Sequence, residues 1–342
     1  MSQVAPGLVT VFGGSGFVGG QVVQALARAG WRIRVAVRRP DRAFKLQTSG
    51  HVGQIYAVRC DATDPAQAAE ALRGADAAVN LVGVLYESGR ATFAAEHVDA
   101  ARNIAEACAA AGVDRLVHVS AIGANPESAS DYARTKAEAE MAVRAVKPDA
   151  VIVRPSVVFG PGDDFLNRFA SMTSWAPALP LIGGGQTKFQ PVYVGDVAAA
   201  IATALSRTES AGRTYELGGP AVMTFEDILK LVTRETHRPR PLVPLPFFAA
   251  RMIGAAAQLT ALVGIKPILT RDQVVQLESD NVVSRDAEGL AELGIEPTGI
   301  EAVAASYLWR YRRGGQFAEA AGWPHARGPP SGPGPPRPPD PP

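Results

Sequence analysis

A glycine-rich loop between an apolar run and a helical pattern most constrains the fold of this chain. Gly13, Gly16 and Gly19 follow the apolar run Leu8–Phe12, and a helical pattern begins at Phe17. Gly13 permits a tight turn, Gly16 lets a pyrophosphate approach the backbone, and Gly19 lets the helix pack close to the strand. The first turn of the helix then offers unpaired N–H groups and a positive dipole end to an anion. This order of strand, loop and helix predicts a dinucleotide site.

Apolar, β-branched runs alternate with alanine-rich helical patterns from residue 7 to about residue 157. This alternation is typical of a parallel sheet with right-handed crossover helices, so the predicted fold class is α/β, a doubly wound parallel sheet or Rossmann fold. Ligands are expected at the carboxyl ends of its strands. We expect strands at Leu8–Phe12, Arg32–Val37, Gln54–Arg59, Ala77–Val82, Leu116–Val119 and Ala150–Arg154, and helices that begin near Phe17, Pro65, Thr92 and Ser130.

The pattern loosens after Pro155. We expect a return strand at Val192–Val194, and Asp196 as the N-cap of a helix at Val197–Leu205. Thr224, with Asp227 three positions on, also precedes a helix. The predicted division is an NAD(P)-binding domain of residues 7–157 and 192–218, a smaller and mainly helical substrate or partner domain of residues 158–191 and 219–313, and a disordered tail rich in proline and glycine at residues 314–342.

One segment of the predicted smaller domain, Val243–Ile265, is unusually apolar, with Arg251 as its only charge. A membrane-spanning helix needs about 20 predominantly apolar residues in a row, and polar residues and glycines interrupt this segment. We therefore expect a buried core helix. A surface that docks on a partner or a bilayer is the alternative.

The composition excludes several classes of function. With 34 basic and 33 acidic residues the net charge is +1, so no nucleic-acid partner is expected. Cys60 and Cys108 show no ligand spacing and are interpreted as buried thiols, and no metal site is predicted. Residues 1–6 have no basic and apolar leader, which favours a cytoplasmic protein. Peripheral attachment at the inner side of the membrane is the alternative.

The second predicted strand ends in basic residues. An acidic residue near this point holds the ribose 2′-hydroxyl in proteins that prefer NAD, whereas arginine suits a 2′-phosphate. Arg38 therefore favours NADP(H) over NAD(H), and the alternative is that Arg38 and Arg39 are simply solvated. Asp41 follows Pro40 and fits the start of a helix.

The ends of the third and fourth predicted strands carry further candidates for contact with the nucleotide. Asp61 could accept a hydrogen bond from the adenine amino group, and the alternative is a helix cap, which fits Asp64 better. Leu81 and Gly83 end the fourth strand, where the backbone must pass near the cofactor ribose.

Tyr132 and Lys136 are four residues apart on a predicted helix and so share one face. An ammonium beside a phenol favours the phenolate, which predicts a lowered pKa for Tyr132. A carbonyl reductase needs this pairing, with the tyrosine as acid and base and the lysine as ribose ligand. Ser120, twelve residues before Tyr132, completes the candidate catalytic set.

These residues resemble the short-chain dehydrogenase/reductase superfamily, in its extended and atypical branches, over residues 7 to about 313. Residues 118–124, 130–136, 268–274 and 280–283 are similar to the nucleotide-binding accessory subunit of respiratory complex I and its bacterial relatives. The carrying positions are Gly13, Gly16, Gly19, Asp61, Tyr132, Lys136, and residues 154–161 and 192–196.

The resemblance implies roles for particular residues. Arg38 would meet the 2′-phosphate, and Tyr132 and Lys136 would meet the nicotinamide ribose. Pro155 and Val157 would flank the nicotinamide. The residues that would line the pyrophosphate are Gly13, Ser15, Gly16, Phe17 and Val18.

The chain departs from active extended members at Ala121 and Ile122, where those proteins tend to have a hydroxyl residue aimed at the substrate carbonyl. Two functions follow. The first is an NADP(H)-binding protein that holds its cofactor largely for structure, assembly or sensing in respiratory or quinone metabolism, with complex I or a membrane-associated assembly as partner. The second is an active NAD(P)-dependent oxidoreductase, epimerase or dehydratase that uses the Tyr132 and Lys136 pair.

Overall fold

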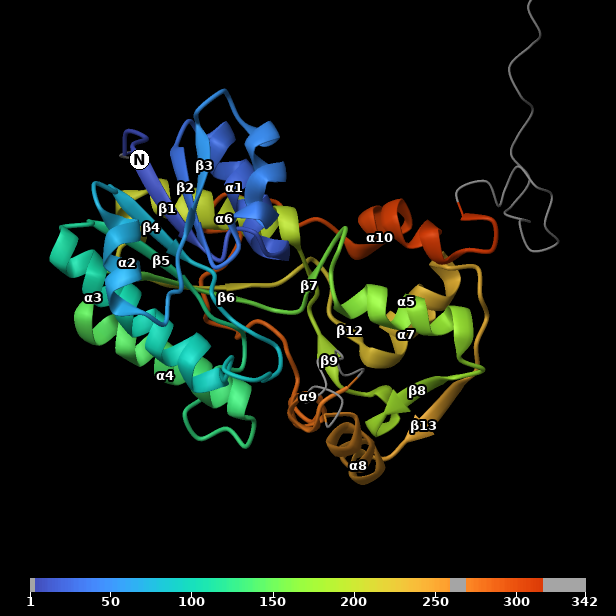
Figure 1. Cartoon of the computed structure of the whole chain (residues 1–342). Coiled ribbons are helices and arrows are strands. Elements are labelled where there is room, and N and C mark those ends of the chain that lie inside the picture. The colour runs from blue at the N-terminus through green and yellow to red at the C-terminus, as the bar shows by residue number, and fades with distance from the viewer. Residues whose placement is uncertain (1–3, 259–268, 316–342) are drawn as a thin grey trace, which may run out of the picture.

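The computed structural model describes residues 4–258 and 269–315. A sheet flanked by helices and a smaller, mostly helical part lie side by side (Figure 1). Residues 259–265 of the apolar segment and residues 316–342 of the predicted tail lie outside the described residues.

The main sheet has seven parallel strands in the order β11-β6-β5-β4-β1-β2-β3. The order reverses between β1 and β4, which is the switch point where a doubly wound sheet opens a crevice for ligands. The predicted fold class is confirmed. The strands are β1 (Leu8–Phe12), β2 (Arg32–Val37), β3 (Ile55–Arg59), β4 (Ala77–Asn80), β5 (Arg115–Val119), β6 (Val151–Pro155) and β11 (Thr214–Leu217).

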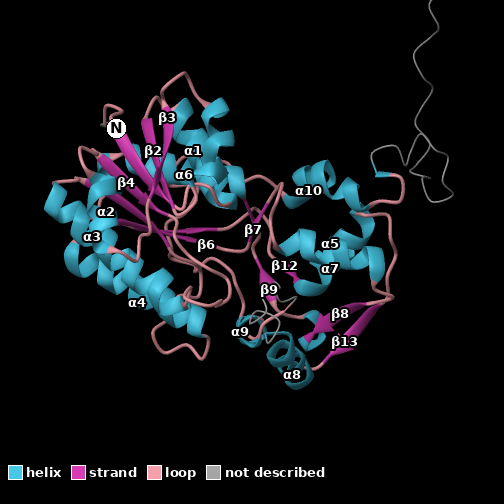
Figure 2. Cartoon of the chain, viewed as in Figure 1, coloured by secondary structure: helices cyan, strands magenta, loops and turns pink. Residues whose placement is uncertain are grey.

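Helices cover both faces of this sheet (Figure 2). One apolar cluster joins one face of the sheet to α1 (Phe17–Arg28) and α6 (Val194–Ser206). A second cluster joins the other face to α2 (Pro65–Leu72), α3 (Ala100–Ala111) and α4 (Asp131–Val146). Because successive side chains of a strand point to opposite faces, each buried strand feeds both clusters.

The predicted element boundaries need small corrections. β4 ends at Asn80 instead of Val82, since the Asn80 Oδ1 atom accepts a hydrogen bond from the Val82 N–H at 2.9 Å and turns the chain. The helix expected near Thr92 begins instead with a π-helical turn, Ala94–Asp99, which runs into α3. Strand β11 was not predicted, although its residues Thr214, Tyr215, Glu216 and Leu217 alternate between polar and apolar side chains.

Asp196 is not an N-cap. Helix α6 begins at Val194 with Tyr193 as its N-cap, and Asp196 lies in the first turn. The Asp196 carboxylate instead accepts hydrogen bonds from the Thr298 N–H at 2.7 Å and from the Thr298 hydroxyl at 3.0 Å. The prediction was wrong because a partner 102 residues away uses the carboxylate. Thr224 does cap α7 (Phe225–Glu235), in a capping box with Asp227.

The smaller part has an apolar cluster of its own. Two-stranded pairs accompany its helices, and β10 pairs with β7 outside the main sheet. The predicted domain boundaries stay predictions. The remaining elements are β7 (Val158–Phe159), α5 (Phe165–Trp175), β8 (Leu179–Ile182), β9 (Lys188–Phe189), β10 (Val192–Tyr193), β12 (Met223–Thr224), β13 (Leu242–Leu245), α8 (Phe247–Gln258), α9 (Arg271–Gln276) and α10 (Ile300–Leu308), with 3₁₀ turns at Pro40–Ser49, Gly183–Gly185, Thr208–Ser210 and Trp309–Tyr311.

Helix α8 is not the core helix expected from its apolar sequence. Phe248 is 69% exposed and Met252 71% exposed, whereas Ala250 and Gly254 face inward. A Cβ on Gly254 would lie 2.9 Å from the Arg271 nitrogen, so the small residues bring α8 close to α9 and turn the large ones outward. None of the helices in the described part of the chain has the length and apolar sequence that a membrane span needs.

Candidate functional site

The glycine loop lies at the switch point of the sheet, between β1 and α1. Gly13 has a φ of +76°, as a tight turn requires, and its carbonyl accepts a hydrogen bond from the Gly16 N–H at 3.1 Å. A Cβ on Gly19 would lie 2.4 Å from the Gly13 oxygen and 2.7 Å from the Gly14 Cα. Gly19 therefore lets α1 close onto the loop itself, more than onto the strand before it.

Gly16 is different, because the protein leaves room beside it. A Cβ there would meet only the Gly13 oxygen, at 3.4 Å. Gly16 is the N-cap of α1, with no side-chain cap and no acidic residue in the first turn. Around it Ser15, Phe17 and Val18 are half-buried. Open N–H groups at a helix N-terminus, with no side chain in front, fit the pyrophosphate of a dinucleotide.

Arg38 follows β2, as predicted for a ligand of the 2′-phosphate, but it already has a partner. Its Nη1 atom lies 2.6 Å from the Glu96 Oε1 atom, and the Arg38 side chain is 55% exposed whereas that of Glu96 is 6% exposed. Sequence reasoning missed Glu96, which the π-helical turn before α3 positions. Such turns occur often at functional sites. Arg39 pairs with Asp41 at the surface, at 3.5 Å.

The two carboxylates after β3 have different surroundings. The Asp61 Oδ1 atom accepts hydrogen bonds from the Thr63 N–H at 3.1 Å and from the Thr63 hydroxyl at 2.8 Å. Asp64 caps α2 through the Ala66 N–H at 2.9 Å, which confirms the cap predicted there. Contact of Asp61 with adenine stays a prediction.

Lys136 brings several of the predicted residues together. Its Nζ atom donates a hydrogen bond to the Val119 carbonyl at 3.2 Å and lies 5.9 Å from the centre of the Tyr132 ring. A Cβ on Gly83 would lie 3.2 Å from the same Nζ atom. Leu81, two residues before Gly83, donates a hydrogen bond from its N–H to the Phe12 carbonyl at 3.0 Å and so extends the pairing of β4 with β1. The loop after β4 and helix α4 therefore meet at the ammonium group.

Burial controls the protonation of this pair. Burial raises the pKa of Tyr132 to about 12, and the charge of Asp272 adds to the effect. Burial also lowers the pKa of Lys136 to about 8, against the charge of Glu140. The prediction that Lys136 lowers the pKa of Tyr132 is wrong. The ammonium is directed at the Val119 carbonyl, and the burial of the phenol is the largest effect on its pKa.

His97 is a buried neighbour of this pair that the sequence did not reveal. Its ring packs edge-on against Tyr132 with centres 5.3 Å apart. Its Nδ1 atom lies 2.9 Å from the Thr135 hydroxyl oxygen, and its Nε2 atom lies 3.2 Å from the Val84 backbone nitrogen. Burial lowers the pKa of His97 to about 2, so the ring stays neutral. His97 thus fixes the loop after β4 against α4.

Ser120 and His118 each carry a buried polar atom without a hydrogen-bond partner in the described part of the chain: the Ser120 hydroxyl oxygen and the His118 Nε2 atom. The His118 Nδ1 atom lies 3.0 Å from the Asn80 amide nitrogen, which leaves the proton on Nε2. Buried polar groups ordinarily find partners, so both atoms fit a site that a ligand completes. Ile122 has no hydroxyl to add.

The predicted nicotinamide neighbours are held from the smaller part. Pro155 ends β6, and the Val157 N–H donates to the Asn281 Oδ1 atom at 3.0 Å. The Asn281 amide also donates to the Ile122 carbonyl at 3.2 Å. Asn281 therefore joins the ends of β5 and β6, and individual residues in the sequence gave no sign of this contact.

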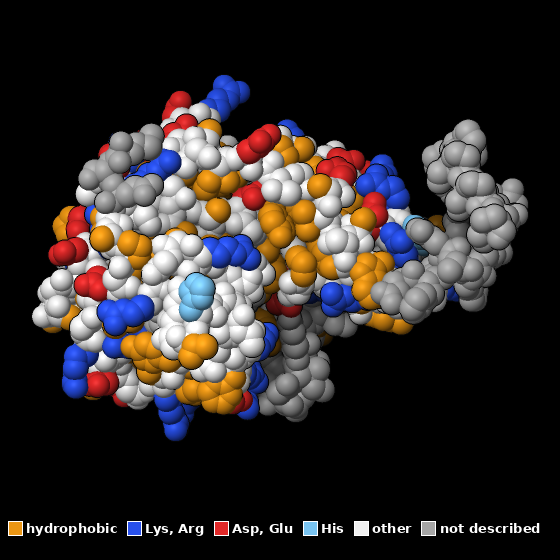
Figure 3. Space-filling model, turned by 90° about the horizontal axis from the view of Figure 1, so that it is seen from above, with side chains coloured by type: hydrophobic (Ala, Val, Ile, Leu, Met, Phe, Trp, Pro, Cys, Tyr) orange, Lys and Arg blue, Asp and Glu red, His pale blue; other side chains and the backbone are white. Residues whose placement is uncertain are grey.

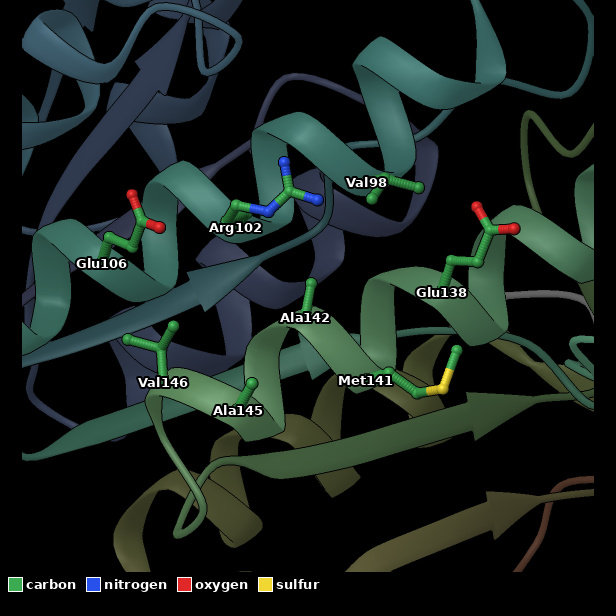
Figure 4. Close-up of a pocket in the computed structure, with 8 residues that line it drawn as sticks. All are labelled: Val98, Arg102, Glu106, Glu138, Met141, Ala142, Ala145 and Val146. Carbon is green, nitrogen blue, oxygen red and sulfur yellow. The ribbon is translucent and has the colours of Figure 1, made fainter.

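A surface groove lies away from these residues, between α3 and α4, with a volume of about 560 Å³ (Figure 4). Arg102, Glu106 and Glu138 point from its two helices, and none of the predicted site residues lines it. The face shown in Figure 3 carries acidic, basic and apolar side chains interspersed, in keeping with the net charge. Among the described residues no group of His, Cys, Asp or Glu has the arrangement of a metal site.

Comparison with known proteins identifies relatives of this chain. The profile of the NAD dependent epimerase/dehydratase family matches residues 9–218. NADH dehydrogenase [ubiquinone] 1 alpha subcomplex subunit 9 of Rattus norvegicus is 36% identical over 313 residues, which cover 91% of this chain and 82% of that protein. Ceramide reductase of Caulobacter vibrioides is 34% identical over 213 residues, 62% of this chain and 65% of that protein.

The fold is shared with solved structures. The NADPH-dependent quinone oxidoreductase QOR2 of Escherichia coli, complexed with NADPH, superposes with a TM-score of 0.69 at 20% identity. The match covers 88% of this chain and 99% of that one.

Proposed function

Because this chain belongs to the NAD dependent epimerase/dehydratase family, we propose that it binds NADP(H) and holds the nucleotide largely for structure, assembly or sensing in respiratory or quinone metabolism. The observation that carries the proposal is the open N-terminus of α1 behind Gly16, at the switch point of the sheet. The similarity to subunit 9 of the complex I alpha subcomplex over 91% of the chain supports complex I, or a related membrane-associated assembly, as partner.

The residues that follow Ser120 support holding over turnover. Tyr132, whose pKa burial raises to about 12, is a neutral phenol that can donate a hydrogen bond to a ribose. Ile122 stands where a second hydroxyl would polarise a carbonyl, so the electrophilic half of a reductase site is incomplete. In this role Tyr132 and Lys136 contribute hydrogen bonds to the nicotinamide ribose. The compartment that we propose for the protein is the cytoplasm or the inner face of a membrane.

The test begins with the nucleotide that natively purified protein releases, identified by mass spectrometry. We expect NADP⁺ or NADPH, and a rise in melting temperature when the stripped protein is saturated with NADPH. A ligand at 100 times its Kd stabilises the native state by about 2.7 kcal/mol. Protein that releases no dinucleotide and shows no ligand-dependent rise would contradict the proposal.

Glu96 is expected to weaken the preference for NADP(H). It competes with a 2′-phosphate for Arg38 and adds a buried negative charge beside it. Glu96→Gln should therefore tighten NADPH binding about threefold to tenfold, while NADH binding changes little, because a surface-accessible ion pair contributes on the order of 1 kcal/mol. Calorimetric titration with both nucleotides checks this. Glu106→Gln on the exposed face of α3 is the matched control, and equal effects on both nucleotides would count against the 2′-phosphate role.

The second candidate function is an active oxidoreductase, epimerase or dehydratase. The buried Lys136 beside Tyr132 and the unpartnered Ser120 hydroxyl favour it. A bound nicotinamide supplies hydride-transfer chemistry. The chain itself would move a proton at the Tyr132 hydroxyl, position the ribose through Lys136, and donate to a carbonyl from Ser120.

If the second candidate is right, Tyr132→Phe should lower turnover of carbonyl substrates by about 10² to 10⁴, the usual contribution of a general acid or base. NADPH affinity should change less than about tenfold, because one hydrogen bond is removed. Steady-state reduction across a panel of quinones and ketones measures the effect. Tyr56→Phe on β3 is the control. Unchanged turnover in the Tyr132 variant, with a substrate that the wild type reduces, removes Tyr132 from the chemistry.

A further inference from the structure

Helix α8 turns three large apolar side chains away from the protein. Phe248 is 69% exposed, Met252 is 71% exposed and Ile253 is 52% exposed. Phe248 and Met252 are four residues apart and Ile253 is beside them, so the three share one side of the helix. Arg251 is the only charged residue of α8, and its Nε atom donates a hydrogen bond to the Glu278 Oε1 atom at 2.8 Å. The outward side of α8 is therefore apolar, and its one charge is already paired.

The exposed apolar surface continues onto the strand that leads into α8. Val243 on β13 is 50% exposed, and β13 pairs with β8 in parallel. Helix α8 packs on the end of β8, since a Cβ on Gly183 would collide with the Phe247 ring. In Figure 1, β8, β13 and α8 form the lower edge of the smaller part, away from the main sheet. We call the exposed side chains of Val243, Phe248, Met252 and Ile253 the α8 surface.

Arginines lie at the other end of β13. The Arg238 Nε atom donates a hydrogen bond to the Tyr311 carbonyl at 2.6 Å, and the Arg240 Nε atom donates one to the Thr173 carbonyl at 3.0 Å. Both acceptors are uncharged, so these hydrogen bonds hold the guanidinium groups without neutralising them. Burial lowers the pKa of Arg238, and the positive charges of Arg313 and Arg240 add to the effect. Like charges therefore gather where β13 begins.

The charge of this part of the chain is not balanced. Residues 236–271 contain five basic residues and no acidic one, whereas the whole chain has 34 basic and 33 acidic residues. Trp175, two residues after the Thr173 carbonyl that holds Arg240, is 64% exposed. An apolar helix face with arginines and an indole beside it is typical of a helix that lies in the headgroup region of a bilayer. The positive charge is complementary to anionic lipid.

We propose that the α8 surface, together with Arg238 and Arg240, binds the surface of an anionic lipid bilayer, with α8 lying in the plane of the headgroups. The apolar side chains enter the boundary between headgroups and acyl chains, and the guanidinium groups pair with lipid phosphates. The inference rests on the proposed function, because it takes the inner face of a membrane as the compartment and assigns the surface that touches it.

The experiment is flotation of the full-length protein with vesicles of phosphatidylcholine, either alone or mixed with phosphatidylglycerol. We expect stronger binding to the mixed vesicles. The double variant Phe248→Ser, Met252→Ser should weaken this binding about tenfold or more, because two apolar side chains no longer leave water. Met141→Ser is the matched control, since Met141 is 54% exposed on α4, and it should float as the wild type does.

A second pair of variants tests the arginines. Arg238→Gln, Arg240→Gln should weaken binding to the mixed vesicles about tenfold or more and remove the preference for phosphatidylglycerol, since each basic residue near an anionic surface strengthens binding severalfold. Arg73→Gln, Arg102→Gln removes the same charge from ion pairs beside α2 and on α3, and it should leave flotation unchanged. Melting temperatures with and without NADPH verify that each variant is folded.

Three results overturn the inference. They are a wild-type protein that floats with neither kind of vesicle, equal flotation of the wild type and the Phe248 and Met252 variant, and equal binding of the wild type to both kinds of vesicle. If light scattering shows a dimer that this variant dissociates, and the wild type does not float, a second copy of the chain covers the surface instead. NADPH binding is measured without vesicles, so its outcome tests the proposed function separately.

Discussion

Gly19→Ala should abolish tight NADPH binding and destabilise the protein by about 3 kcal/mol, the upper range for overpacking a closely packed site. The added Cβ would stand 2.4 Å from the Gly13 oxygen and 2.7 Å from the Gly14 Cα. Both are backbone atoms, so no side-chain rotation relieves the contact. The loop must move away from α1. The N–H groups at the helix N-terminus then no longer point at the pyrophosphate and cannot donate hydrogen bonds to it. Losing two such charge-assisted hydrogen bonds corresponds to roughly 100-fold or more in affinity.

The next residue is a matched control. A Cβ on Gly20 would have the Leu46 Cδ2 atom as its nearest neighbour, at 3.6 Å, which is an ordinary contact. Gly20→Ala should therefore stabilise α1 by up to about 1 kcal/mol through helix propensity, with NADPH binding retained. Urea unfolding and NADPH titration of the two variants measure the contrast. If both variants behave alike, the close approach of Gly19 to the loop is not what builds the cradle.

Lys136→Met should raise the stability of the nucleotide-free protein by about 1 to 3 kcal/mol and lower its affinity for NADPH roughly tenfold or more. The ammonium is buried, and Val119 supplies its hydrogen bond at 3.2 Å through an uncharged carbonyl. Replacing a buried charge by an apolar side chain of similar length removes the desolvation penalty. The same change removes the proposed donor to the nicotinamide ribose. Stability and binding should therefore move in opposite directions, as expected where a functional group is held at a cost.

The effect has a defined pH dependence. Lys136 has a pKa of about 8 in the folded chain, and a lysine in an unfolded chain has a pKa of about 10.4. Between these values the unfolded state binds more protons, so this group makes stability rise with pH. The advantage of Lys136→Met should be full below pH 8 and should fade as the pH approaches 10. Unfolding both proteins from pH 6 to pH 10 tests this, because other titrating groups cancel in the difference. A constant advantage would mean that Lys136 is not buried as a cation.

Local sequence patterns were sufficient to predict most of the architecture. The periodicity of apolar residues predicted six of the strands in the main sheet within two residues at each end. Thr224 and Asp64 were recognisable as caps because a cap acts within three residues of itself. Asp196 and α8 show the limit of this reasoning. The carboxylate of Asp196 is used by Thr298, and the exposed face of α8 follows from its small residues packing on α9.

The same division holds for the candidate site. Gly13, Gly16, Tyr132 and Lys136 were identifiable from spacing, because the glycine loop and a single helix turn are local features. The rise in the pKa of Tyr132, where a lowering was predicted, was not identifiable from spacing, since desolvation depends on what packs around the phenol.

The sequence by itself determined that this chain forms a doubly wound sheet with a glycine loop at its switch point, where we propose that the dinucleotide binds. Interactions between residues close in sequence set the alternation of strands and helices, the glycine turn and the capped helix starts. These features can therefore be predicted from the sequence. Only the tertiary structure decided that Glu96 holds Arg38, that burial raises the pKa of Tyr132, and that His97 fixes the loop after β4 against α4. Charges and burial depend on partners that lie far apart in sequence, and folding alone brings those partners together.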